Sequence, residues 1–117
     1  MVIKNENLNS KTTKNAFGGI GEQDYKEILP LSLLEPMGRV LGIVTIPPSS
    51  TTAYHSHEGE NEVYHILSGE GLYNDNGKEV LVKKGDTAFC QSGQGHGIKN
   101  IGDSDLVFLA FIFYTKD

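Results

Sequence analysis

Apolar and β-branched residues recur along this chain in short runs, and turn-forming residues separate one run from the next. Runs of about four to eight such residues, bounded by Gly, Pro, Asn, Asp or Ser, are typical of strands. The turn signals recur roughly every 8–12 residues, which predicts an all-β sandwich or barrel. The pattern predicts strands over residues 39–46, 62–67, 71–73, 78–82, 87–90, 98–101 and 106–114.

The strongest local signal lies between two of these runs, in Asn74-Asp75-Asn76-Gly77. An Asn-Gly pair tolerates the positive φ angles of a tight turn, so we expect a β-hairpin here. Helical periodicity is weak throughout the chain. The one short helix that the pattern allows covers residues 25–34, where Pro30 interrupts the hydrogen-bond ladder.

The first 16 residues differ in composition from the rest of the chain. They are rich in Asn, Lys, Ser and Thr and offer little to bury, so we expect residues 1–16 to form a flexible arm. A turn-rich stretch, residues 17–21, then leads into a single domain over residues 17–117. A chain of 117 residues has room for one hydrophobic core.

The net charge of −5 and the single cysteine narrow the functional classes. Nucleic acids and anionic membranes are bound by clustered Lys and Arg, which this sequence lacks, so we expect neither partner. The apolar run over residues 106–114 is shorter than the roughly 20 residues that span a membrane. Without a signal peptide or an internal disulfide, we expect a cytoplasmic protein. Cys90 is then either a small core residue or a redox-active thiol.

Four potential metal ligands stand out. His55 and His57 are two apart, and on a strand such residues point to the same face. Glu62 follows five residues later, and His96 sits in a glycine-rich turn. Three imidazoles and a carboxylate suit a divalent first-row metal. His65 has the opposite parity from Glu62, so we expect it on the other face, as a polar or interface residue.

The spacing of these residues resembles the two sequence motifs of the cupin superfamily, and eight of the ten fixed positions match. The first motif, G-x5-H-x-H-x4-E-x6-G, is matched at His55, His57, Glu62 and Gly69, with Ser49 in place of the opening glycine. The second, G-x5-P-x-G-x2-H-x3-N, is matched at Gly85, Gly93, His96 and Asn100, with Gln91 in place of the proline.

The resemblance implies a double-stranded β-helix, a jelly-roll barrel, preceded by a short irregular or helical N-terminal segment. It also implies one divalent transition metal per chain, Mn, Fe, Ni, Co or Zn, on the four ligands. Four protein ligands saturate tetrahedral zinc, whereas an octahedral ion keeps two positions open. An enzyme of this type is therefore expected to use an octahedral metal.

A small-molecule pocket is expected inside the barrel, beside the metal. Tyr64 and Ile66 share the parity of Glu62, and Ile98 shares that of His96, so these residues are candidates for the pocket wall. Gln91 is a candidate for the rim. Core packing is an equally good interpretation of Tyr64.

The resemblance leaves three functions open. The first is a metal-dependent enzyme, a dioxygenase, an isomerase or a decarboxylase such as those for oxalate, acting on a small oxygenated or carboxylate substrate. Its acid or base has weak candidates in Glu62, Tyr64, Glu60 and Glu58, although a solvated loop is the simpler interpretation of the last two. The second is a non-catalytic, metal-stabilised binding or sensing module. The third, a metal-free sugar-nucleotide epimerase, is disfavoured by the intact ligand set.

A second copy of the chain is also an expected partner. Residues 106–114 are apolar on both faces of the predicted strand, whereas an exposed sheet face alternates with polar residues. Either the N-terminal segment or another subunit must cover the outer face. We expect a homodimer, as is usual for single-domain cupins.

Overall fold

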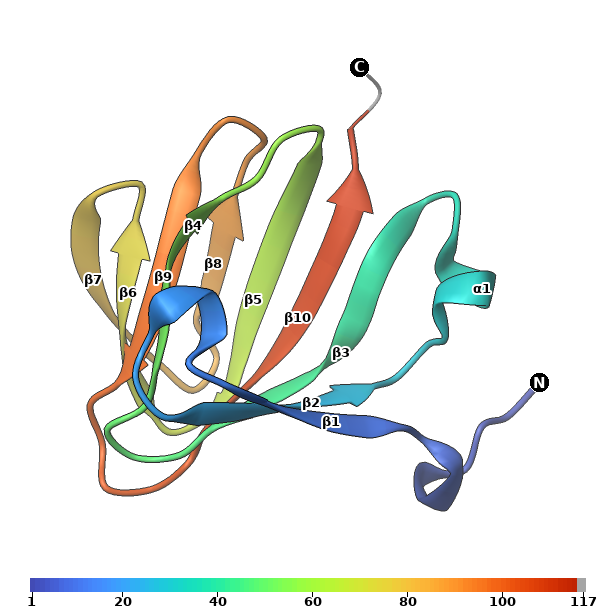
Figure 1. The fold of residues 1–117 in the computed structure, drawn as a ribbon, viewed down its shortest axis with the longest axis horizontal. Helices are drawn as coiled ribbons and strands as arrows, with labels where there is room; N and C mark the ends of the chain where they lie inside the picture. Colours follow the sequence, from blue (N-terminus) through green and yellow to red (C-terminus); the bar gives the residue numbers. More distant parts are fainter. Residues whose placement is uncertain (116–117) are drawn as a thin grey trace.

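Two antiparallel sheets make up most of the computed structural model, which describes residues 1–115 (Figure 1). The six-stranded sheet contains, in spatial order, β1 (Ser10–Lys14), β2 (Glu22–Glu27), β3 (Gly38–Ile46), β10 (Leu106–Tyr114), β5 (Glu60–Ser68) and β8 (Thr87–Cys90). The four-stranded sheet contains β4 (Thr51–Ser56), β9 (Gly95–Asn100), β6 (Glu70–Asp75) and β7 (Lys78–Lys83). The short helices are η1 (Asn5–Asn7), η2 (Ala16–Gly18) and α1 (Leu31–Leu34).

The core lies between the two sheets and follows the alternation of each strand. On β10, Leu106, Phe108, Ala110 and Ile112 are buried, while the residues between them are only partly covered. Large apolar side chains from both sheets, such as Ile98 on β9, meet the first three of these residues in one cluster. Each fully buried side chain of this size contributes roughly 1.5–3 kcal/mol. The predicted all-β fold is therefore confirmed. Part of its packed core also lines the cavity that is described below.

The predicted hairpin is present between β6 and β7. Asn76 and Gly77 both adopt positive φ, at 50° and 100°, as the tight turn requires. The Gly77 backbone N–H donates to the Asn74 side-chain oxygen at 2.7 Å, which closes the turn.

The N-terminal segment differs from the expected flexible arm. Ser10–Lys14 form β1, which pairs antiparallel with β2 at the edge of the six-stranded sheet. The strand is polar on both faces because its inner face borders a cavity and its outer face borders solvent. A hydrophobicity pattern gives no signal for such a strand.

The expected helix over residues 25–34 is also different. Tyr25 belongs to β2, and only the four residues after Pro30 are helical. Proline has no backbone N–H to donate and a fixed φ, so it suits the start of a helix and not its interior. Within residues 1–115, no helix has the length and apolar character needed to cross a membrane.

Candidate metal centre

Three strand ends bring the four predicted ligands together. His55 lies on β4, directly opposite His96 of β9 in the register, and His57 follows β4 by one residue. Glu62 projects inward from β5. The close packing of β9 against β4 requires the glycine after His96, because a Cβ on Gly97 would lie 2.9 Å from a backbone nitrogen of β4. The strand pairing thus places ligands 41 residues apart in one cluster.

The donor atoms of this cluster converge. Oε1 of Glu62 lies 2.9 Å from Nε2 of His57 and 2.8 Å from Nε2 of His96. The two Nε2 atoms are 3.1 Å apart, and all four residues, His55 included, offer donor atoms within 4.8 Å of one another. Atoms bound to one ion at about 2.0–2.2 Å lie roughly 3 Å apart when their bonds are at right angles. The donor set therefore fits a divalent ion.

Each histidine uses its Nδ1 atom for a bond away from the cluster. His55 Nδ1 donates to the backbone carbonyl of Ala53 at 2.9 Å, and His96 Nδ1 lies 2.8 Å from the hydroxyl of the buried Tyr73. An imidazole that donates through Nδ1 keeps the lone pair on Nε2 for a metal. These bonds fix the orientation of the rings before any ion binds.

The third histidine has a charged partner. His57 Nδ1 lies 2.8 Å from Glu60 Oε1, and Arg39 donates to both carboxylate oxygens of Glu60 at 2.7 Å. Glu60 is only 9% exposed, which corrects the expectation of a solvated loop residue. Glu58, the other candidate in that loop, is exposed. Glu60 is thus tied to a ligand and a cation, in the arrangement that orients metal-binding histidines.

The electrostatics favour ionised carboxylates at the centre. The hydrogen bonds from Arg39, with a smaller contribution from His57, outweigh the opposing effect of burial and lower the pKa of Glu60 to about 2. Burial raises the pKa of Glu62, but hydrogen bonds from two histidines outweigh it, so the pKa lies below its usual range. Burial lowers the pKa of His55, which favours the neutral, ligating form. The hydrogen bond to Glu62 raises the pKa of His57, so a proton competes with a metal for this residue.

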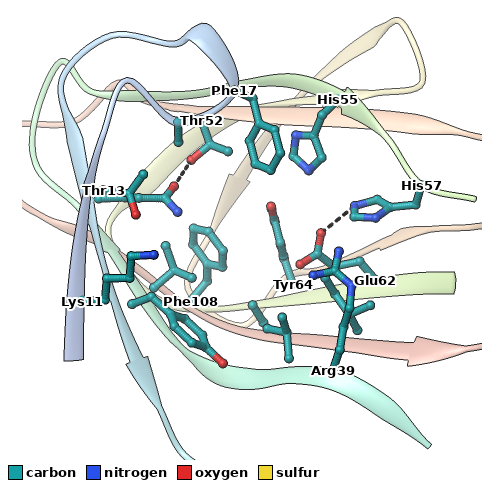
Figure 2. Close-up of a pocket in the computed structure, with 17 residues that line it drawn as sticks. Lys11, Thr13, Phe17, Arg39, Thr52, His55, His57, Glu62, Tyr64 and Phe108 are labelled. Atoms are coloured by element: carbon teal, nitrogen blue, oxygen red, sulfur yellow. Dashed lines mark hydrogen bonds and ion pairs between the residues drawn. The ribbon is translucent and has the colours of Figure 1, made fainter. Parts of the chain in front are cut away.

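A cavity of about 460 Å³ opens beside the cluster, and Figure 2 shows His55, His57 and Glu62 at one end of it. His96 does not line this cavity. Its walls are largely apolar, with a few polar groups, as in most small-molecule sites. Tyr64 lines the cavity and packs at 4.2 Å between ring centroids against Phe108. The opposite end is formed by β1, which lies in the segment expected to be a flexible arm, and by β2.

The other expected wall residues lie elsewhere. Ile66 and Ile98 are buried in the core cluster but do not line this cavity. Strand parity fixed their face correctly, but it does not report depth along the barrel. Gln91 is exposed and also does not line the cavity. His65 lies on the outer face of β5, bonded to Thr87 at 2.9 Å, in line with its parity.

Several residues of the site gave no sequence signal. The ring of Phe17 stacks on the ring of His55, with centroids 3.8 Å apart and planes at 11°. Arg39 occupies a β-bulge, because the register of β10 passes from Val40 to Gly38, and both Arg39 and Val40 line the cavity. Bulges redirect side chains in this way, and a strict alternation pattern does not reveal them.

Comparison with known proteins agrees with this architecture. Residues 42–112 match the Cupin domain family, and the chain belongs to that family. The oxalate-binding protein of Thermotoga maritima is 40% identical over 112 residues, which cover 96% of this chain and 93% of the relative. An uncharacterised protein of Methanocaldococcus jannaschii is 33% identical over 84 residues, covering 72% of this chain and 67% of its own.

A solved structure is similar over almost the whole chain. It is described as a predicted oxalate decarboxylase from Thermotoga maritima and has a TM-score of 0.93 and 39% identity. The match covers 98% of this chain and 100% of that one. The double-stranded β-helix expected from the motifs is confirmed, and the group of His55, His57, Glu62 and His96 can hold a metal ion.

Proposed function

We propose that this protein holds one divalent transition-metal ion on His55, His57, Glu62 and His96 and there binds a small carboxylate, with oxalate as the first candidate. The observation that carries the proposal is the convergence of the four donors while each histidine is oriented through Nδ1. When bound, a Mn, Fe, Ni, Co or Zn ion supplies a Lewis acid for a carboxylate oxygen. Relatives named for oxalate support the ligand class.

Two protein groups are placed to hold such a carboxylate. Arg39 lines the cavity and binds Glu60 through its Nε and Nη2 atoms. Its third nitrogen, Nη1, makes no hydrogen bond within residues 1–115 and is available to a ligand. The Tyr64 side chain projects into the cavity near Glu62 (Figure 2). Burial raises the pKa of Tyr64, so its hydroxyl stays protonated and can donate. Charge-assisted donors of this kind are the strong ones for carboxylates.

The lining favours binding over turnover. Proton transfer to a substrate needs a group of suitable pKa within reach. Among the described residues that line the cavity, Glu62 is the one carboxyl group, and it belongs to the ligand set. Of the other weak catalytic candidates, Glu60 is occupied by Arg39 and His57, and Glu58 is exposed and does not line the cavity. Burial raises the pKa of Tyr64, so its hydroxyl is a poor base. A binding or sensing module is therefore the function that the geometry supports best, and metal-dependent decarboxylation is the alternative to be tested.

The test combines metal loading, calorimetry and product analysis. Protein stripped with a chelator is reconstituted separately with Mn, Fe, Ni, Co and Zn, and oxalate is titrated into each form and into the stripped form. We expect binding to depend on the metal, with oxalate recovered unchanged. Release of formate or carbon dioxide would show an enzyme instead. Equal oxalate binding by the stripped protein would contradict the proposal.

We also propose that the protein is a homodimer. Leu41, Ile43, Phe111 and Phe113 lie on the outer face of the six-stranded sheet, where they are only partly buried. The N-terminal strands extend this sheet at its edge, so a second copy is the cover that we propose for the face. Light scattering is expected to give twice the chain mass. Phe111→Glu is expected to give a monomer, whereas Leu81→Glu, at a 70% exposed position on the other sheet, serves as the matched control.

A further inference from the structure

The cavity has two polar ends with an apolar stretch between them. His55, His57 and Glu62 of the metal-ligand cluster form one end. At the other, the register pairs Lys11 with Tyr25 and Thr13 with Gln23, and all four residues line the cavity. In Figure 2 the Lys11 side chain points into the cavity from β1, across from Glu62. Val44, Phe108, Ala110 and Ile112 contribute apolar wall to the same cavity.

The end near β1 has unused hydrogen-bonding capacity. Within residues 1–115, Lys11 has no hydrogen bond or ion pair, whereas Lys26, the lysine on β2, is bonded to Asn5. The Oε1 atom of Gln23 accepts a hydrogen bond from Thr52. The amide nitrogen of Gln23, a donor, has no hydrogen bond among the described residues 1–115. An ammonium group and an amide N–H are both donors suited to a carboxylate.

The charges that face the cavity suit a dianion. Glu62 offsets one of the two positive charges of a divalent ion, and the Arg39–Glu60 pair is neutral overall. Lys11 adds one positive charge, so the loaded cavity carries two. Both charges of oxalate lie within one compact ion, however, and a molecule of six non-hydrogen atoms fills less than half of 460 Å³, taking about 30 Å³ for each atom as for a water.

We propose that Lys11, assisted by Gln23, binds the far carboxylate of a dicarboxylate longer than oxalate, whose apolar spacer lies against the wall near Phe108. This inference rests on the proposed function, because the near carboxylate occupies the histidine end. Lys11 is then a specificity residue: it distinguishes a dicarboxylate from a monocarboxylate of the same length. The segment expected to be a flexible arm becomes the part of the protein that selects the ligand.

Calorimetry on metal-loaded protein tests the proposal with a series of carboxylates of increasing chain length. Succinate, glutarate and adipate are compared with butyrate, valerate and hexanoate, and with oxalate. We expect at least one longer dicarboxylate to bind about tenfold tighter than its matched monocarboxylate, the usual scale of one charge-assisted hydrogen bond. Lys11→Met should abolish that advantage and leave metal content unchanged. Lys14→Met removes the same charge from the same strand at a position outside this cavity and should retain the advantage.

A charge reversal separates direct contact from general electrostatics. Lys11→Glu should weaken the binding of dicarboxylates. It should strengthen the binding of probes with a carboxylate at one end and an ammonium at the other, such as 5-aminopentanoate. Oxalate binding without any advantage for longer dicarboxylates would overturn this inference and leave the proposed function intact. Equal losses in Lys11→Met and Lys14→Met would overturn it too. Failure of every carboxylate, oxalate included, to bind the loaded protein would overturn both.

Discussion

The two walls of the cavity are built in opposite ways. On the barrel side, β4, β5 and β9 position the proposed metal ligands, of which His57, Glu62 and His96 are buried and His55 is partly buried. Each histidine of the group is oriented by another hydrogen bond. On the N-terminal side, β1 is polar throughout, Lys11 lacks a partner within residues 1–115, and Phe17 is 63% exposed. Networks that are buried and fully bonded are rigid, whereas exposed edges with few buried contacts open locally. The two proposals place metal binding at the first wall and ligand selection at the second.

Removal of a ligand should give the largest effect on the barrel wall. Glu62→Ala takes away the carboxylate that lies within 2.9 Å of two histidine Nε2 atoms. If four ligands share about 10–16 kcal/mol, the loss of one weakens metal binding on the order of 100- to 1,000-fold. Chelator competition with metal analysis measures this. Glu58→Ala, at an exposed position, is the control, and retention of metal by Glu62→Ala would mean that Glu62 is not a ligand.

The accessibility of Cys90 to a thiol reagent measures how tightly the barrel side is packed. Cys90 pairs with Glu62 in the β5–β8 register and is 1% exposed. Burial raises the pKa of its thiol to about 11 from 9.0, so at pH 8 the reactive thiolate is about 100-fold scarcer than for an ordinary cysteine.

A thiol reagent should therefore label the folded protein at least about 100-fold more slowly than the urea-unfolded protein. In a Lys14→Cys variant, which keeps Cys90, the added cysteine on β1 should react in the folded protein as fast as it does in the unfolded protein. Rapid labelling of Cys90 in the folded state would show that the barrel wall is as open as the N-terminal one.

The bond from Glu60 to His57 is expected to tune the metal site without forming part of it. Glu60→Gln keeps an acceptor for His57 Nδ1 but removes the charge and leaves Arg39 without its ionic partner. Loss of such an orienting partner lowers metal affinity by about 10–100-fold. Glu58→Gln should have no effect. Unchanged affinity in Glu60→Gln would show that the neutral hydrogen bond alone suffices.

The same contrast explains what the sequence could and could not predict. Motif spacing located all four members of the group that can hold a metal ion, since strand parity and turn positions are local properties of the sequence. The role of Glu60 depends on Arg39, which is 21 residues away and is redirected by a bulge next to β10. Local patterning placed Glu60 in a solvated loop because it contains no information on the long-range Arg39–Glu60 pair.

The N-terminal wall was missed for a different reason. Hydrophobic patterning detects surfaces that are buried in a core, and Lys11 and Thr13 face a cavity instead. The composition of β1 therefore resembles that of an unstructured segment. Tyr73, whose hydroxyl contacts His96, was hidden for a third reason: a buried tyrosine next to a ligand has the same pattern as one that only packs.

Phe17 tests the N-terminal wall with the smallest expected effect. Its ring stacks on His55 at 3.8 Å, but it comes from η2, adopts a φ of 55° and remains largely exposed. An aromatic contact of this kind is worth about 0.5–1.5 kcal/mol. Phe17→Ala should therefore weaken carboxylate binding by about 3–10-fold, because the cavity loses part of its cover, while metal affinity changes by less than about threefold. Phe17→Tyr keeps the stacked ring and is the matched control.

Both affinities must be measured on the same preparations, by chelator competition and by carboxylate titration. If Phe17→Ala weakens metal and carboxylate binding equally, the N-terminal wall supports His55 as a ligand and the division between the two walls fails. If only carboxylate binding weakens, the exposed wall acts on the ligand alone. The free energy of unfolding should fall by no more than the worth of the stacked contact, about 0.5–1.5 kcal/mol, because a side chain that is 63% exposed buries little further area.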